Sequence, residues 1–298
     1  MPGHIPVLLH EAIEGLALRP GETIVDATLG GGGHSAKICE HIGPRGILVA
    51  LDEDPDAFPR SEKVLGDTPC RKIFIHGNFR RMKELLEAEG ISRAGGILFD
   101  LGISSFHLEV SGRGFSFRRK EPLLMTLGKS IERTAYEIVN TWSEKELTHI
   151  FNEYGEEQFA RPIAQAILKA REDAPIGESD QLAEIIERAV PRWYRAKKIH
   201  PATKTFQALR IATNDEVAAL EEGLGAAWEV LAPGGRLAVI SFHSLEDRIT
   251  KVFFKEKEAA GKGELITRKP IQPGRLEART NPRSRSAKLR IIEKILTE

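Results

Sequence analysis

Four consecutive glycines occupy positions 30–33 in the stretch DATLGGGGHS, between an apolar segment and a helix-like segment. Glycine loses more backbone freedom on folding than any other residue, so a run of glycines needs a physical reason. Close approach of the backbone to a ligand is one reason, and a flexible turn is the alternative. A loop between a strand and a helix lies at the carboxyl end of a parallel sheet, where open α/β proteins bind ligands. This position favours a ligand-binding loop.

Two cofactors compete for the loop. Residues 31–36 fit the dinucleotide pattern GxGxxA, which is weak when it stands alone. Residues 26–32 fit DxxxGxG, the acidic loop usual in methyltransferases that use S-adenosylmethionine (SAM), where the acid lies near the cationic methionine end. A dinucleotide places its pyrophosphate at the helix N-terminus, and a carboxylate nearby would repel it. Asp26 therefore favours SAM.

Two further carboxylates end predicted strands. Asp52 can accept hydrogen bonds from both ribose hydroxyls of SAM or NAD, and the alternative is a helix cap or a turn residue. Asp100 can accept a hydrogen bond from an exocyclic amine and orient its lone pair toward a methyl group. A strand-end cap is the alternative for Asp100. Phe79 follows the third predicted strand and either packs on an adenine ring or belongs to the core.

Apolar runs at 23–28, 46–52, 72–76, 96–100 and 236–242 predict strands, and helix-like segments such as 36–42 and 80–89 alternate with them. This alternation implies right-handed crossovers and a parallel sheet. Residues 106–194 contain no buried-strand run. Ser143 and Glu146 have the spacing of a capping box, and helices are predicted at 159–171 and at 179–190, the latter N-capped by Ser179.

The strand pattern returns after a long predicted helix at 205–231, and the polar segment 259–281 is predicted to be a loop or lid. We therefore expect an α/β protein with a Rossmann-like core built from residues 1–105 and 205–298. A helical insertion at 106–204 would lie between these two parts. The C-terminal part carries a basic segment.

The composition is that of an ordinary globular protein. The 298 residues include 43 Lys and Arg against 43 Asp and Glu, so nucleic-acid binding must rest on local basic patches. No apolar run reaches the ~18 residues of a membrane-spanning helix, and the N-terminus lacks a secretory pattern. Cys39 and Cys70 lack metal-site spacing and cannot form a disulfide framework, so we expect a reduced, cytoplasmic, soluble protein. The nine histidines lack HExxH spacing, and no metal is predicted.

Nine blocks along the chain resemble the bacterial small-subunit ribosomal RNA methyltransferase H family, also called MraW. They are HIPVLLHEAI (4–13), DATLGGGGHS (26–35), LDEDP (51–55), DLGISS (100–105), RGFSF (113–117), YGEEQFAR (154–161), HPATKTFQALRIATND (200–215), PGGRLAVISFHSLEDR (233–248) and NPRSRSAKLR (281–290). The resemblance implies a SAM-dependent enzyme that methylates N4 of a cytidine in the decoding centre of 16S rRNA, within the small ribosomal subunit. It also implies a Rossmann-like core with a helical insertion.

The resemblance also implies a set of cofactor contacts. The family's positions correspond here to Gly32, Gly33, His34, Asp52, Phe79, Asp100 and His107. His107 stands where the family normally has Gln. A second departure is the run PLLMTLG at 122–128, where the family usually has PLDMRMD. If that loop orders the cytidine or the cofactor, activity or site specificity could differ.

Three basic clusters could bind RNA, at 113–120, 192–198 and 279–294. The first two interleave cations with aromatic residues, which suits base stacking and phosphate contact. A solvated charged face is the alternative for each, and Trp193 and Tyr194 could instead anchor the insertion. Candidate RNA-contacting residues are Arg113, Phe115, Phe117, Arg118, His243, Arg283 and Arg285.

Two other functions stay open at this point. One is an NAD-dependent oxidoreductase that uses the 31–36 loop, although no Lys/Tyr or His/Asp pair suggests a hydride-transfer site. The other is a non-catalytic RNA-binding protein of ribosome assembly, suggested by the altered 122–128 run. Binding of SAM against NADH separates the oxidoreductase from a methyltransferase.

Overall fold

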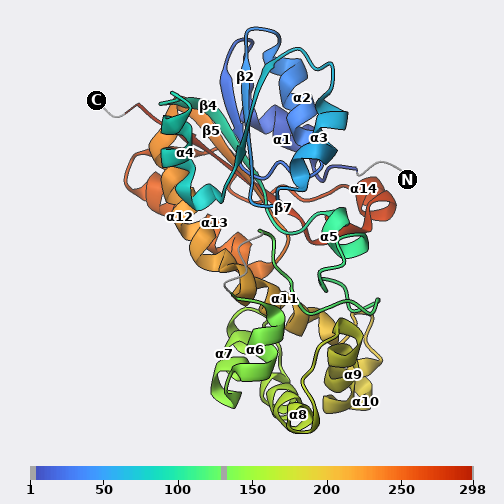
Figure 1. The fold of residues 1–298 in the computed structure, drawn as a ribbon. Helices are drawn as coiled ribbons and strands as arrows, with labels where there is room; N and C mark the ends of the chain where they lie inside the picture. The colour runs from blue at the N-terminus through green and yellow to red at the C-terminus, as the bar shows by residue number, and fades with distance from the viewer. Residues whose placement is uncertain (1–4, 129–132, 297–298) are drawn as a thin grey trace. The chain divides into compact units, whose positions relative to one another are not determined.

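A seven-stranded sheet is the centre of the first of two units in the computed structural model, which describes residues 5–128 and 133–296 (Figure 1). This unit runs to Gly102 and resumes at Val217, and the second unit is Ile103–Glu216. The strand order is β3-β2-β1-β4-β5-β7-β6. The strands are β1 (Thr23–Asp26), β2 (Ile47–Asp52), β3 (Arg71–His76), β4 (Ala94–Asp100), β5 (Leu231–Ser241), β6 (Gly263–Leu265) and β7 (Lys288–Lys294).

Strands β1 to β5 are parallel, and β7 runs antiparallel to both β5 and β6. From β1 the chain moves outward to β2 and β3, and then returns to β4 on the other side of β1. Open α/β sheets bind ligands beside the carboxyl ends of the strands at such a reversal. The predicted α/β, Rossmann-like fold is confirmed, and all five predicted strands are present. Strands β6 and β7 were not predicted.

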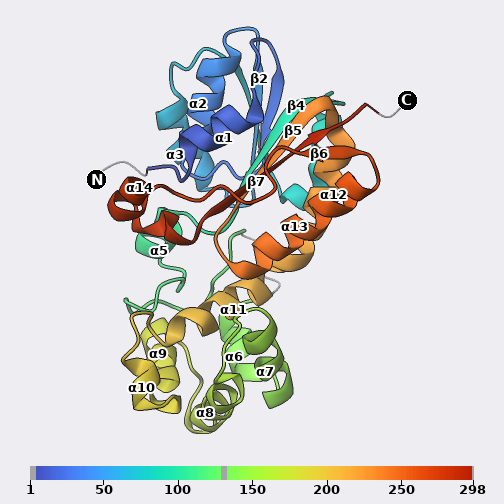
Figure 2. The same cartoon turned by 180° about the vertical axis from the view of Figure 1, so that it is seen from behind.

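Helices cover both faces of this sheet because successive strand residues point to opposite sides. Val25 and Val49 pack in one apolar layer, whereas their neighbours Ile24 and Leu48 pack in the other. Figures 1 and 2 show helices on both faces of the sheet. One face carries α1 (Leu9–Leu16), α2 (Gly33–Ile42) and α3 (Ala57–Leu65), and the other carries α4 (Met82–Ala88), α12 (Glu216–Val230) and α13 (Ser244–Ala259).

In the described residues of the second unit the regular elements are all helices, apart from one isolated bridge between Pro122 and Glu178. Its helices are α5 (Ser105–Glu109), α6 (Ala135–Thr141), α7 (Glu144–Glu153), α8 (Ala160–Asp173), α9 (Ser179–Ala189), α10 (Arg192–Arg195) and α11 (Ala202–Asn214). The predicted capping box is confirmed at α7. The Glu146 N–H donates to Ser143 Oγ at 3.3 Å, and Glu146 Oε2 accepts from the Ser143 N–H at 2.8 Å.

Three predicted elements differ from the structure. The N-cap of α9 is Glu178, because Ser179 is buried and its hydroxyl donates to the Arg119 carbonyl at 2.7 Å. The helix predicted at 205–231 is two helices, because Asp215 is left-handed at φ 50° and separates α11 from α12. Helix α11 packs against α6, α7 and α9, so the second unit extends beyond the insertion bounds expected from the sequence.

The loop predicted at 259–281 contains regular structure. It holds β6 and α14 (Arg275–Thr280), and the short helix η2 (Pro282–Ser286) follows. Strand β6 pairs with β7, so the polar composition of this segment reflects an edge strand and an exposed helix. The prediction of an irregular segment was wrong here because edge elements need few apolar residues.

Cys39 and Cys70 form a disulfide in the structure, with a Cα–Cα distance of 5.1 Å. Cys39 lies on α2 and Cys70 immediately precedes β3, and both are buried in the apolar layer beneath α1 and α2. The expectation of reduced thiols is therefore wrong for this structure. The sequence separation of 31 residues gave no sign of the contact, which depends on how α2 lies against the sheet.

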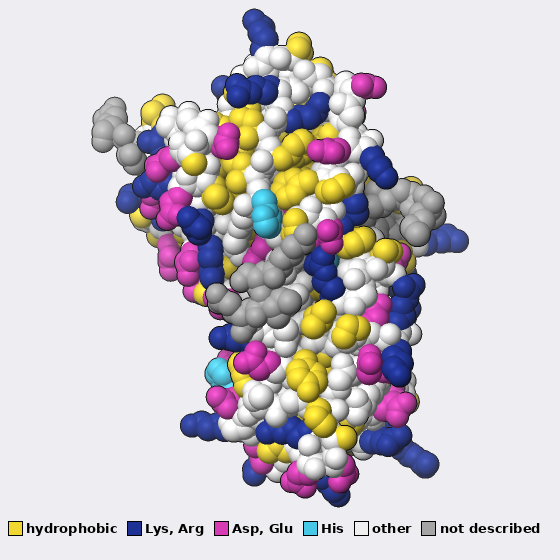
Figure 3. Space-filling view, viewed as in Figure 1, with side chains coloured by type: hydrophobic (Ala, Val, Ile, Leu, Met, Phe, Trp, Pro, Cys, Tyr) yellow, Lys and Arg dark blue, Asp and Glu magenta, His cyan; other side chains and the backbone are white. Residues whose placement is uncertain are grey.

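None of the helices in the described ranges is long and apolar enough to cross a membrane. On the face shown in Figure 3, basic and acidic side chains are interspersed over each unit. This distribution agrees with the zero net charge of the sequence.

Candidate functional site

The glycine loop connects β1 to α2 in a conformation that needs glycine. Gly30 and Gly32 have φ values of +49° and +78°. A Cβ atom at Gly32 would lie 2.9 Å from Ser61 Cβ on α3, and one at Gly33 would lie 2.3 Å from Pro6 Cγ. The glycines thus let the loop pack tightly between α3 and the N-terminal segment. Part of the reason for the glycines is therefore packing within the chain and not contact with a ligand.

Asp52 lies against this loop from the end of β2. Its Oδ2 accepts from the Gly30 N–H at 2.8 Å, and its Oδ1 accepts from the Asp54 N–H at 2.8 Å. A carboxylate accepts hydrogen bonds at both oxygens, which is the chemistry that a ligand hydroxyl requires. The structure therefore brings Asp52 and the glycine loop together, as the sequence predicted.

Replacing Asp52 by alanine is expected to weaken SAM binding by ~1–3 kcal/mol, the range for removing a charged hydrogen-bond partner. Two effects add, because the variant loses the predicted ribose contact and the carboxylate that holds the Gly30 amide. Isothermal titration calorimetry with SAM measures the change. Asp52→Asn is the matched control, since it keeps the shape and one acceptor oxygen. Unchanged SAM affinity in Asp52→Ala would remove Asp52 from the site.

Asp26 is only 1% exposed and holds the loop from within the protein. Its Oδ1 accepts from the Thr28 N–H at 3.1 Å, and its Oδ2 accepts from Ser35 Oγ at 2.6 Å. Burial raises the pKa of Asp26, although these hydrogen bonds and the nearby His34 oppose the shift. Asp26 therefore shapes the loop from beneath it. Its burial argues against the direct cofactor contact suggested by the sequence.

His34 and Asp100 face each other across the carboxyl ends of β1 and β4. His34 Nδ1 lies 3.4 Å from Asp100 Oδ2, and His34 Nε2 lies 3.0 Å from the Val7 carbonyl oxygen. The Asp100 N–H donates to Thr28 Oγ1 at 2.7 Å, which fixes the end of β4 against the loop. Asp100 Oδ1 is buried and has no hydrogen-bond partner among the described residues. A buried carboxylate oxygen without a partner is costly, so it is a natural place for a ligand donor.

Burial by itself lowers the pKa of His34, but the Asp100 carboxylate, with Asp26 and the Val7 carbonyl, reverses this and raises the pKa above the ordinary 6.5. A group whose folded pKa is raised stabilises the fold fully below its unfolded pKa, and this stability is lost as pH rises through the folded pKa.

We therefore expect His34→Gln to lose stability relative to the wild type mainly below about pH 6.5, because the glutamine cannot carry the charge that faces Asp100. The difference should shrink as pH rises through the raised pKa of His34. Chemical denaturation of both proteins across this pH range is the measurement. A stability difference that does not vary with pH would contradict a charged His34.

Phe79 starts the short helix η1 (Phe79–Arg81) after β3. Its ring packs edge-on against Phe99 with centroids 5.2 Å apart, and Gly223 of α12 leaves the space that the ring fills. Phe79 is half-buried in the apolar layer beneath α12, so the structure gives it a core role while leaving part of the ring exposed. Adenine packing on the exposed part stays a prediction.

His107, the other predicted cofactor residue, belongs to the second unit. It is 6% exposed, and its Nδ1 accepts from the Ser104 N–H at 3.2 Å in a capping box at the start of α5. Its ring also packs against Phe115. These contacts give His107 a structural role within its own unit, and its cofactor role stays a prediction.

The basic cluster at 113–120 is largely part of the helical unit. The Arg113 guanidinium donates to the Thr126 and Leu127 carbonyls at 3.2 and 2.9 Å. Phe115 is 5% exposed, and Phe117 stacks on His200 with centroids 4.4 Å apart. Burial excludes Phe115 from base stacking in this structure, and Arg118 is the exposed member of the four predicted residues.

Trp193 and Tyr194, in the basic cluster at 192–198, differ in role. One anchors the helical unit, and the other stays a candidate for RNA binding. Tyr194 is buried, and its hydroxyl donates to Glu157 Oε2 at 2.8 Å, so it anchors α10. Trp193 is 57% exposed, with Lys197 Nζ 4.9 Å from its ring centroid. The exposed ring and its cation keep a base-stacking role open for Trp193.

Some cations of the C-terminal basic cluster at 279–294 form ion pairs within the protein. Lys288 and Arg290 on β7 bind Asp247 of α13 at 2.8 and 2.7 Å. Burial acts to raise the pKa of Asp247, but these two cations lower it below its usual range. Arg285 is exposed and donates through Nε to the Ala278 carbonyl at 2.9 Å, and Arg283 is half-buried. RNA contact by Arg283 and Arg285 stays a prediction.

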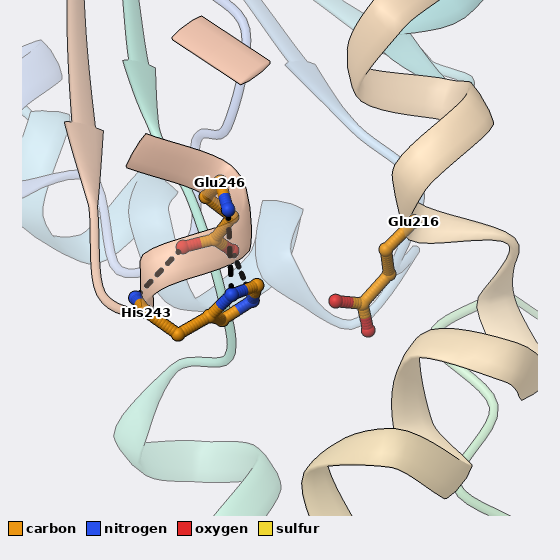
Figure 4. A group of neighbouring side chains, drawn as sticks. All are labelled: Glu216, His243 and Glu246. Atoms are coloured by element: carbon orange, nitrogen blue, oxygen red, sulfur yellow. Dashed lines mark hydrogen bonds and ion pairs between the residues drawn. The ribbon is translucent and has the colours of Figure 1, made fainter. Parts of the chain in front are cut away.

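His243 caps α13 at the end of β5 (Figure 4). Its Nδ1 accepts from the Glu246 N–H at 3.4 Å, its Nε2 lies 3.1 Å from Glu246 Oε1, and Glu246 Oε2 accepts from the Phe242 N–H at 2.7 Å. Glu216, also drawn in Figure 4, binds Arg210 within the second unit through two hydrogen bonds at 2.8 Å. Each of these side chains thus has a structural partner in its own unit. The substrate role of His243 and the absence of a metal stay predictions.

Sequence reasoning missed three residues that complete this site. Thr28 and Ser35 are the small hydroxyl residues on either side of the glycines, and hydroxyls near a helix start commonly accept or donate locally. The carbonyl of Val7 carries no sequence signal, because any residue would present it.

The chain is similar to known proteins over nearly its whole length. A family model described as the MraW methylase family matches residues 1–295. The protein named Ribosomal RNA small subunit methyltransferase H in Paenibacillus sp. (strain JDR-2) is 45% identical over 313 residues, which cover 98% of this chain and 99% of the relative. The protein of that name in Carboxydothermus hydrogenoformans is 47% identical over 307 residues and covers 98% of each chain.

Among solved structures, a protein from Clostridium thermocellum that is provisionally described as an rRNA methylase aligns with a TM-score of 0.50 and 14% identity. The alignment covers 98% of this chain and 99% of that chain. At this identity the likeness concerns the fold alone.

Proposed function

Since the chain belongs to the MraW methylase family, we propose that it is a SAM-dependent methyltransferase that acts on small-subunit ribosomal RNA. We further propose that the target is the N4 amine of a cytidine in the decoding centre of 16S rRNA, within the small ribosomal subunit. A ribosomal substrate places this activity in the cytoplasm.

The observation that supports this function is the arrangement of carboxylates at the reversal of strand order. Asp52 and Asp100 end β2 and β4 on either side of β1, and Asp26 lies buried at the end of β1 between them. SAM carries a sulfonium charge, and three carboxylates around the glycine loop favour a cationic ligand. Asp52 suits the ribose of either cofactor, but the carboxylates at the ends of β1 and β4 would disfavour the pyrophosphate of NAD, which argues against the oxidoreductase alternative.

The residues present also fit SAM by their donors and acceptors. The Asp52 carboxylate has the acceptor chemistry that ribose hydroxyls require, and Phe79 is half-buried beside the same loop end of the sheet. Asp100 Oδ1 is the unsatisfied acceptor, which suits a donor such as an exocyclic amine. When bound, SAM supplies an electrophilic methyl group.

In this proposal Asp100 acts by orientation. Its Oδ1 accepts a hydrogen bond from the cytidine amine and directs the nitrogen lone pair toward the methyl group. His34 and the Thr28 hydroxyl hold the carboxylate and the end of β4 in place. The amine proton released after transfer needs no strong base and can pass to water.

The unusual 122–128 run is ordered within the second unit. Asn214 binds it from both sides, accepting from the Leu127 N–H at 2.9 Å and donating to the Met125 carbonyl at 2.7 Å. Apolar Leu123 and Met125 are fully buried there. Both of these residues match the family pattern, so the packing of the loop does not depend on the departures at Leu124, Thr126 and Gly128, whose effect on activity stays a prediction.

Methylation of isolated small-subunit particles tests the function directly. Particles lacking the modification are incubated with the protein and SAM carrying a labelled methyl group, and the labelled nucleoside is identified by mass spectrometry. Label on N4 of one decoding-centre cytidine is the expected result. Label on another base would overturn the proposed target, and SAM binding without any transfer would favour the assembly role.

A further inference from the structure

One peptide group in the N-terminal segment lies between two ionisable side chains. The Leu8 N–H donates to Glu277 Oε1 at 2.9 Å, and the Val7 carbonyl oxygen lies 3.0 Å from His34 Nε2. These are the N–H and C=O of the same planar peptide bond. Glu277 on α14 and His34 in the cofactor loop are therefore attached to opposite ends of one rigid amide.

The Val7 carbonyl also determines which protons His34 carries. A carbonyl oxygen only accepts, so the hydrogen bond requires the proton on Nε2. Nδ1 can then donate to Asp100 Oδ2, 3.4 Å away, only when the ring carries a second proton. The charged groups that face this ring are Asp100 from β4 and Asp26 from β1, and both favour the imidazolium.

The segment that presents this carbonyl is held in place by contacts from outside itself. Leu8 is left-handed at φ 51°, a conformation that residues with a Cβ rarely adopt, while its side chain is 1% exposed. Asn281 Nδ2 donates to the Ile5 carbonyl at 3.0 Å, and the missing Cβ of Gly33 admits Pro6. Figures 1 and 2 both show α14 beside the segment that leads into α1.

We propose that Glu277 is a positioning residue for the catalytic site, which acts through the Val7–Leu8 peptide to hold His34 toward Asp100. This inference rests on the proposed SAM-dependent function. A carboxylate bound to the amide N–H polarises the peptide and makes its carbonyl a stronger acceptor, so it fixes the imidazole more firmly. The exposed α14, which carries Arg275 and Arg279, is thereby connected to the methyl-transfer site by named contacts.

The test uses three variants of the full chain. Glu277→Ala removes the carboxylate, Glu277→Gln keeps an acceptor oxygen without the charge, and Leu276→Ala is the control, because Leu276 is 77% exposed on the same helix. The readouts are SAM affinity by calorimetry, thermal melting, and the titration of His34 by NMR of carbon-13-labelled histidine. The His34 signal is assigned by its loss in His34→Gln.

Glu277→Ala is expected to weaken SAM binding by about fivefold to tenfold and to lower the pKa of His34. Glu277→Gln should restore most of the SAM affinity, because its amide oxygen still accepts from Leu8. Leu276→Ala should match the wild type in both.

A Glu277→Ala protein that melts lower but keeps the wild-type His34 titration and SAM affinity would overturn the proposal and leave Glu277 a merely structural residue. Failure of the proposed function looks different, because the wild type itself would then not bind SAM. The titration of His34 would still report on the contact with Glu277 in that case.

Discussion

Replacing Asp100 by alanine is expected to slow methyl transfer by about a hundredfold or more at saturating SAM, with a much smaller loss of SAM affinity. The reason is that Asp100 Oδ1 is the buried acceptor that would orient the target amine, and orientation acts mainly in the transition state. The measurement is single-turnover methylation of small-subunit particles, with SAM affinity determined separately by calorimetry.

Asp100→Asn is the matched variant, since it keeps the size of the side chain and one acceptor oxygen. Both variants leave the buried His34 without its carboxylate, so folding is checked by thermal melting above the pH at which His34 loses its charge. If Asp100 were only a strand-end cap, alanine would cost about 1 kcal/mol of stability with normal turnover of the folded protein. A rate restored by more SAM would instead assign Asp100 to the cofactor alone.

Gly32→Val is expected to abolish measurable SAM binding and to lower the stability of the protein by about 2–5 kcal/mol. Gly32 has φ +78°, and a Cβ there would lie 2.9 Å from Ser61 Cβ and 3.2 Å from Ser61 Cα. The loop must therefore move away from α3.

Gly43 gives a control for the backbone strain alone. It follows the other end of the same helix with φ +66°, and a Cβ there would meet nothing within 4 Å. Gly43→Ala should therefore lose a little stability and keep SAM affinity, whereas Gly32→Ala should lose both. Chemical denaturation and SAM calorimetry on the two alanine variants separate the effects. Equal behaviour of the two variants would show that packing against Ser61 is unimportant.

The strands and the cofactor loop were predictable because their signals are local. Buried parallel strands are continuous apolar runs, and the four glycines mark a tight connection wherever they occur. Once the strands are predicted, their last residues are known, and these include Asp52 and Asp100. Strand β7 escaped prediction because its cations, such as Lys288 and Arg290, suggested a binding surface, whereas the fold uses them to bind Asp247.

The residues that contact the glycine loop and His34 were not predictable. They are distant in sequence, and they act through groups that carry no sequence signal. Ser61 matters through the position of its Cβ, and Val7 through a main-chain carbonyl. The break at Asp215 was missed for a related reason. The apolar spacing before and after Asp215 fits a single helix. The break is visible only in the structure, where Asp215 is left-handed and α11 packs against α6, α7 and α9.

Strand β7 lies between β5 and β6, although it follows both in the chain. A ribosome releases residues in order, so β5 emerges with its outer edge unpaired and waits for residues 288–294. Glu277 and Asn281, which hold the N-terminal segment on the cofactor loop, are also made long after that loop. A nascent chain thus has its glycine loop early but completes the surroundings of His34 only when residues 277–281 have emerged. A chain that stops before residue 288 is left with an exposed sheet edge that chaperones and proteases can recognise.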